Sequence, residues 1–252
     1  MNILTAIAQE NGLELAERLM PRPTPRSLAC LPCRLGTDQV MEIHGATGTG
    51  KSLYLAHIIT QVLTGSENGE VLFINVDHTI NAYDFHDMLS QQVGSDMSKK
   101  HLKRLLMVDI CELEDFQGFL NVLPAAISSN ANLFLIAIDS LGSFYYVERL
   151  STRIYSHDSY VKQKLKKVMD CLGNIKIPII FTKQDIFSVN AKTTKGPKSQ
   201  VKTSIQLENT QDTHFIKRGI LTETRGLRQH NHCFKLVLTG TKDIRIQPDT
   251  SH

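Results

Sequence analysis

The chain contains no tryptophan, and aromatic residues make up only 6% of its 252 positions. Its five cysteines are odd in number and scattered, which excludes a fully paired disulfide framework and favours a reducing compartment. No apolar run approaches the roughly 18 residues of a bilayer-spanning helix, so we expect no membrane partner. A basic start is also missing, and Glu10, Glu14 and Glu17 interrupt the first apolar residues, so we expect no secretory signal. We therefore expect a soluble intracellular protein.

Neither sign of charge dominates, since 28 basic residues face 25 acidic ones and the net charge is +3. So small an excess permits contact with nucleic acid without requiring it. Metal signatures are equally scarce. The histidines lack His-Glu-x-x-His spacing, and Cys30 and Cys33 form a Cys-x-x-Cys that no second pair completes. This favours two ordinary loop thiols over a zinc or redox site.

One motif is complete. Residues 45–52 read Gly-Ala-Thr-Gly-Thr-Gly-Lys-Ser, a G-x-x-x-x-G-K-[ST] phosphate loop between a short apolar run at 40–43 and a helical pattern that follows. Its glycines let backbone N–H groups turn toward phosphates, and the start of the helix adds positive potential. Lys51 is placed to reach the β and γ phosphates, and the Ser52 hydroxyl to ligate Mg²⁺. The motif predicts ATP and Mg²⁺ as cofactors. The candidate cofactor-binding residues are Gly45, Ala46, Thr47, Gly48, Thr49, Gly50, Lys51 and Ser52.

Apolar runs alternate with helical patterns after this loop. The predicted strands cover 71–76, 105–110, 133–138 and 177–182. Helical spacing covers 82–93, 113–127 and 161–172, with Gly173 as the stop of the last helix. Continuous apolar strands in a βαβ order predict an α/β fold with a parallel sheet. Candidate strands near 219–224, 233–239 and 243–247 then predict an antiparallel addition to that sheet.

Two segments differ from this core. Residues 1–37 are predicted to form one or two short helices followed by a proline-rich extended connector, and 38–252 form the core domain. The stretch 190–202 is polar and lacks acidic residues, so we expect a mobile loop there.

Asp139 ends the predicted strand at 133–139, at the edge of the sheet where a P-loop ATPase holds its metal. Together with Ser52 it forms the candidate Mg²⁺ site. A helix cap is the alternative role for an Asp-Ser pair.

Two further strand ends carry candidate catalytic residues. Asp77 follows the strand at 71–76 and could orient an attacking water, the alternative being a turn aspartate. Gln184 closes the strand at 177–183, where an amide could sense the γ-phosphate or simply lie at the sheet edge.

Basic residues gather in two places. The candidate DNA-binding residues are Lys192, Lys195, Lys198 and Lys202, in the polar loop. Only Phe187 offers a stacking ring beside them, so a solvated lysine loop stays open as an alternative. The second group consists of Lys162, Lys164, Lys166 and Lys167, and we predict a solvated helix face there.

The phosphate loop, the strand ends at Asp77 and Asp139, and the strand ending in Gln184 resemble, in this order, the RecA-type recombinase ATPases. A closer resemblance is to the eukaryotic recombinase paralogues of the X-ray repair cross-complementing type, the short kind that lacks an N-terminal DNA-binding domain. The runs that carry it are 11–19, 71–77, 133–149 and 215–228.

This resemblance implies a RecA-like core and a nuclear, ATP-binding subunit for homologous-recombination repair of DNA double-strand breaks. It implies a hetero-oligomer with another recombinase paralogue, assistance to a recombinase filament, and contact with single-stranded or branched DNA through 185–206. Asp77 stands where the recombinases have a catalytic glutamate, so weak or partner-dependent hydrolysis is expected.

Two other functions stay open. A P-loop kinase acting on a small metabolite needs clustered arginines over the phosphates, whereas Arg218, Arg225 and Arg228 are dispersed. A self-filamenting, DNA-stimulated ATPase needs a head-to-tail contact, and the arm at 21–37 lacks the Phe-x-x-Ala anchor of the recombinases.

Overall fold

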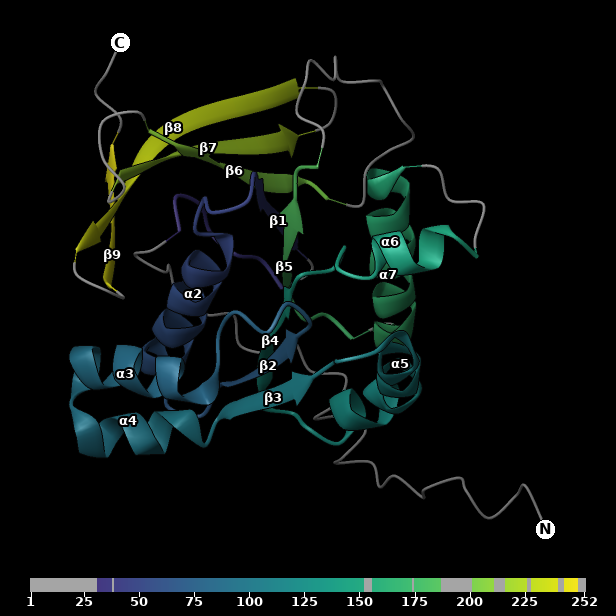
Figure 1. Ribbon diagram of the computed structural model, residues 1–252. Coiled ribbons are helices and arrows are strands. Elements are labelled where there is room, and N and C mark those ends of the chain that lie inside the picture. The colour runs from purple at the N-terminus through teal and green to yellow at the C-terminus, as the bar shows by residue number, and fades with distance from the viewer. Residues whose placement is uncertain are drawn as a thin grey trace.

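The structure is a computed structural model, and it describes residues 31–37, 39–151, 156–173, 175–186, 201–210, 216–225, 228–239 and 243–248. Its centre is a nine-stranded sheet in the order β3-β2-β4-β5-β1-β6-β7-β8-β9 (Figure 1). The strands are β1 Val40–Gly45, β2 Glu70–Asn75, β3 Leu105–Asp109, β4 Leu133–Asp139, β5 Ile179–Gln184, β6 Thr203–Asn209, β7 Ile216–Arg225, β8 Arg228–Thr239 and β9 Asp243–Pro248. Strands β1 to β6 pair in parallel, and β6 to β9 pair antiparallel. The predicted fold class is confirmed.

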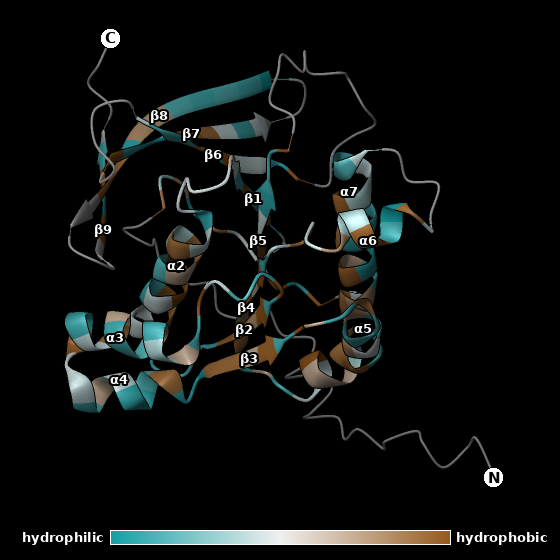
Figure 2. Ribbon diagram, viewed as in Figure 1, coloured by the Kyte–Doolittle hydropathy of each residue, from teal (hydrophilic) through white to brown (hydrophobic). Residues whose placement is uncertain are grey.

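Helices cover both faces of the parallel part of the sheet (Figure 1). On one side lie α2 Lys51–Gly65, α3 Ala82–Val93 and α4 Ser95–Leu102, and on the other lie α5 Leu113–Ser128, α6 Tyr145–Arg149 and α7 His157–Leu172. Alternate residues of each strand feed two separate cores, as Phe73 packs with the α2 side and Ile74 with the α5 and α7 side. Figure 2 shows hydrophobic residues concentrated in β2, β3 and β4, while the first half of β8 is hydrophilic. Among the described residues, no helix has the length and apolar character needed to cross a bilayer.

The boundaries differ from the sequence prediction in a few places. Strand β5 begins at Ile179 rather than 177, because Pro178 has no N–H to give to the ladder. Strand β6 and helices α4 and α6 were missed. The signal for β6 was its period of two, in which Thr203, Ile205 and Leu207 are buried and the residues between them are not. The predicted N-terminal helices and most of the predicted mobile loop lie outside the described residues.

Gly173 ends α7 as predicted, with a φ of 56° that favours glycine.

The prediction of a solvated lysine face on α7 is wrong for one residue. Lys162, Lys166 and Lys167 are exposed, whereas Lys164 is only 4% exposed. It lies one helical turn after the buried Tyr160, so its stem falls on the apolar stripe. The Lys164 Nζ lies 2.5 Å from Glu148 Oε2 of α6 and about equally far, 5.2 and 5.1 Å, from the ring centroids of Phe116 and Tyr160.

Replacing Lys164 by Met should test how much this ion pair stabilises the fold. The methionine keeps the apolar stem but removes the ammonium group that faces the Glu148 carboxylate, whose side chain is 13% exposed. We expect a loss of about 3 kcal/mol in the free energy of unfolding, measured by urea denaturation. Lys166→Met, on the exposed face, is the matched control and should change stability by about 0.5 kcal/mol or less. Equal stability of the two variants would contradict a structural role for the pair.

Candidate nucleotide site

The phosphate loop connects β1 to α2, as predicted. Gly48 and Gly50 take φ values of 78° and 85°, which residues with a Cβ rarely adopt. Gly50 precedes the first turn of α2 and brings no capping side chain, and that turn contains no acidic residue. The positive end of α2 is therefore left to attract an anion.

Lys51 lies across this loop. Its Nζ donates a hydrogen bond to the Ala46 carbonyl oxygen at 2.8 Å. Burial lowers the pKa of Lys51, although the nearby Asp139, Asp185 and Asp77 oppose that shift. A polyphosphate would add further negative charge beside this ammonium and so favour its charged form.

The Asp139 carboxylate at the end of β4 is 1% exposed and accepts bonds from three hydroxyl groups. Its Oδ1 accepts from Ser52 at 3.1 Å and Thr182 at 2.5 Å, and its Oδ2 accepts from Thr79 at 3.2 Å. Burial raises the pKa of Asp139 despite these donors, and the nearby Asp77 adds to that shift. The helix-cap alternative is excluded, because the next helix, α6, has Phe144 at its N-cap.

The oxygen atoms of Ser52 and Asp139 fit Mg²⁺, which prefers hard oxygen ligands. Within the described residues no cluster of three or more His, Cys, Asp or Glu side chains could hold a metal ion. A magnesium ion here would therefore rely on one carboxylate, one hydroxyl, water and the nucleotide's own phosphates, which is a common arrangement for this ion. Bound there, Mg²⁺ would neutralise phosphate charge.

The two candidate catalytic residues also reach the site. Asp77 follows β2, its N–H donates to the Asp139 carbonyl oxygen at 2.9 Å, and its side chain is exposed. Gln184 ends β5, and its Nε2 donates to Thr47 Oγ1 in the phosphate loop at 2.6 Å. The structure thus brings both residues beside the loop, and their catalytic roles stay predictions.

Of the four candidate DNA-binding residues, the structure describes Lys202 alone. Lys192, Lys195 and Lys198 lie outside the described residues. Lys202 directly precedes β6, which runs parallel to β1. It therefore lies at the amino ends of the parallel strands, whereas the phosphate loop lies at their carboxyl ends. There it lines a surface hollow with Arg34 and Glu223.

Cys33 lines the same hollow. Burial raises the pKa of its thiol to about 11, which fits the expected ordinary thiol, and Cys30 lies outside the described residues.

Several residues of the site were not found from sequence. Thr182 is fully buried in β5, and a lone polar residue at the end of the apolar run at 177–182 was its only signal. Nothing in the sequence indicated a role for Thr79.

Asp185 was also not found from the sequence. It binds His44, with 2.9 Å between Oδ2 and Nδ1, and its N–H donates to the Gly45 carbonyl oxygen at 3.0 Å. Burial opposes the shift, but this partner holds the pKa of Asp185 below its usual range.

Comparison with known proteins supports the fold and the predicted resemblance. No protein-family model matches the chain. The DNA repair protein XRCC2 of Mus musculus is 28% identical over 206 residues, which cover 75% of this chain and 73% of XRCC2. The crystal structure of the RadB recombinase matches with a TM-score of 0.61 and 14% identity, covering 82% of this chain and 91% of that one.

The chain is thus similar in sequence to a DNA repair protein and in fold to a recombinase. The structural likeness shows a RecA-like fold, and the sequence likeness confirms the predicted resemblance to the X-ray repair cross-complementing paralogues. Neither comparison supports the kinase alternative.

Replacing Asp139 by Asn should separate the stability of the nucleotide-free protein from ligand binding. Because the pKa of Asp139 is raised in the folded chain, its favourable contribution is full at low pH and is lost as pH rises through that pKa. The variant has no such titration, so the difference between its melting temperature and that of the wild type should shift in favour of the variant as the pH rises above 3.8, the ordinary pKa of an aspartate. Addition of Mg²⁺ and ATP should stabilise only the wild type.

The exposed Asp170 in α7 provides the control through Asp170→Asn, whose melting temperature should follow that of the wild type at each pH. A constant difference between Asp139→Asn and the wild type would contradict the raised pKa.

Proposed function

We propose that this chain is an ATP-binding recombinase-paralogue subunit that acts in homologous-recombination repair of DNA double-strand breaks in the nucleus. The observation that carries the proposal is the contact between Ser52 of the phosphate loop and Asp139, at 3.1 Å within a RecA-like sheet. That contact closes a site for the phosphates and the metal of a nucleotide. The likeness to a DNA repair protein and to a recombinase supports the repair role.

The subunit would assemble with another recombinase paralogue and assist a strand-exchange filament. An edge strand supports a protein partner, because β3 borders the sheet and its Leu106 is 38% exposed. An edge strand offers unpaired N–H and C=O groups, which an extended segment of another chain can bind. Apolar side chains at such an edge favour a protein over a solvated surface.

Hydrolysis of ATP would be slow or dependent on the partner. Asp77 is exposed, and its side chain is one methylene shorter than the glutamate of the recombinases. A carboxylate held further from the phosphates orients an attacking water less well. Contact with single-stranded or branched DNA would involve Lys202 and the lysines before it.

Binding of a fluorescent ATP analogue with Mg²⁺ tests the nucleotide site directly. Replacing Lys51 by Ala removes a charge-assisted contact to phosphate, so the affinity should fall about tenfold or more. Lys99→Ala on the exposed surface of α4 is the matched control and should bind as the wild type does. Equal affinity of wild type and Lys51→Ala would contradict the assigned site.

Co-purification from native extract tests the assembly. A recombinase-family protein should accompany the wild-type chain, and the isolated complex should contain nucleotide. A stable monomer with no affinity for any recombinase-family protein would contradict the proposal. ATP consumption that depends on a metabolite, and on neither DNA nor a partner, would favour a kinase instead.

A further inference from the structure

The loop at 76–81, between β2 and α3, holds both the backbone and the side chain of Asp139. The N–H groups of Val76 and Asp77 donate to the Asp139 carbonyl oxygen at 2.5 and 2.9 Å. Three residues into the loop, Thr79 Oγ1 donates to Asp139 Oδ2 at 3.2 Å. The loop that carries the candidate catalytic Asp77 therefore also contacts the candidate metal ligand.

The two oxygens of Asp139 are bound differently. Oδ1 accepts from Ser52 and Thr182, which belong to the phosphate-loop helix and to the neighbouring strand. Oδ2 accepts from Thr79. The torsion that turns a carboxylate about its Cβ–Cγ bond has a broad minimum, so donors on both oxygens are needed to fix its orientation. Thr79 supplies the donor on the second oxygen.

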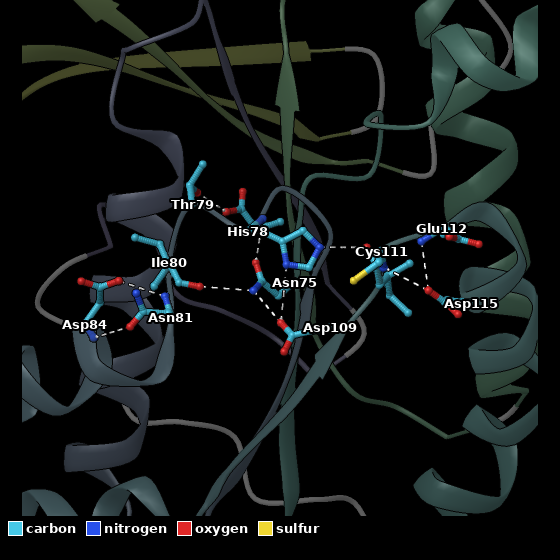
Figure 3. A network of polar contacts seen from close by, with 12 residues as sticks. Asn75, His78, Thr79, Ile80, Asn81, Asp84, Asp109, Cys111, Glu112 and Asp115 are labelled. Carbon is cyan, nitrogen blue, oxygen red and sulfur yellow. Dashed lines mark hydrogen bonds and ion pairs between the residues drawn. The ribbon is translucent and has the colours of Figure 1, made fainter.

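Figure 3 shows the side-chain amide of Asn75 bonded to His78 and Ile80, on either side of Thr79. Asn75 is 3% exposed, and its Oδ1 accepts from the N–H of His78 at 3.1 Å. Its Nδ2 donates to the Ile80 carbonyl oxygen at 3.2 Å and to Asp109 Oδ1 at 2.7 Å. The residues immediately before and after Thr79 are thus both tied to one side chain.

The same loop is fastened at two further points (Figure 3). His78 has a φ of 53°, and its Nε2 bonds to the Ile110 carbonyl oxygen at 3.1 Å, beyond β3. Asn81 begins α3 through a capping box with Asp84. Thr79 therefore lies between two residues, His78 and Asn81, that hydrogen bonds hold in place, and these bonds fix the position of its hydroxyl.

We propose that Thr79 is a positioning residue for the magnesium-nucleotide site, which it serves by holding Oδ2 of Asp139 while Oδ1 stays beside Ser52. The inference rests on the proposed nucleotide binding. Partners behind a metal ligand fix its direction, and losing one typically costs about tenfold to a hundredfold in metal affinity or activity. Loss of the Thr79 hydroxyl should therefore weaken nucleotide binding in the presence of Mg²⁺ and leave nucleotide binding without Mg²⁺ unchanged.

Replacing Thr79 by Val keeps the shape of the side chain and removes its hydroxyl, and the exposure of Thr79 makes misfolding a small concern. Affinity for a fluorescent ATP analogue would be measured by titration in Mg²⁺ and again in EDTA. We expect Thr79→Val to bind about tenfold more weakly in Mg²⁺ and equally well in EDTA. Thr79→Ser restores the hydroxyl and should keep the wild-type ratio of the two affinities.

The matched control is Thr64→Val, which removes a partly buried hydroxyl that bonds within α2 to the Thr60 carbonyl oxygen at 2.9 Å. It should leave both affinities unchanged. The inference is overturned if Thr79→Val keeps the wild-type ratio, or if Thr79→Ser loses as much as Thr79→Val, and nucleotide binding by the wild type would survive either result. A wild-type chain that binds no nucleotide in Mg²⁺ would overturn the inference and the proposed function together.

Discussion

The rest of the site is organised around one carboxylate that is removed from water. Asp139 ends the fully buried strand β4, and a charge at such a position is costly unless hydrogen bonds or a cation compensate it. Its three hydroxyl donors come from α2, β5 and the loop after β2. Because these elements must converge to satisfy one side chain, the packing of the central strands and the geometry of the phosphate loop depend on each other.

The Asp139 carboxylate accepts three hydrogen bonds, but none of these donors carries a positive charge. Hydroxyl groups are neutral donors, and burial still raises the pKa of the carboxyl. Burial likewise lowers the pKa of Lys51, at the start of α2, although the nearby carboxylates oppose that shift. A magnesium-polyphosphate complex would bring positive charge to Asp139 and negative charge to Lys51, and so would favour the charged form of each. Such paired, unfavourable ionisations are typical of sites that bind a charged ligand.

Sequence patterns predicted the parts of this structure that local chemistry determines. The glycines and Lys51 of the phosphate loop, the βαβ order and the strand end at Asp139 all follow from spacing and apolar runs. Long-range contacts escaped that reasoning, since Thr79 and Asp139 are distant in sequence and meet only because β2 and β4 are neighbours in the sheet. Lys164 was misjudged because a long stem can lie on an apolar stripe while its charge finds a partner on another helix.

The order of strands also determines what the nucleotide site can influence. Strand β5 ends beside the phosphate loop, where Gln184 bonds to Thr47 and Asp185 bonds to His44 and to the backbone of Gly45. Strand β6 begins at the opposite end of the strands, because β5 and β6 both run parallel to β1. Ile186 therefore lies at the carboxyl ends of the parallel strands, and Val201 lies at their amino ends. Any movement of the phosphate loop that breaks the bonds of Gln184 or Asp185 would therefore loosen the end of β5, whereas the Gln39 bond to Thr203 and the β6 ladder would hold the start of β6.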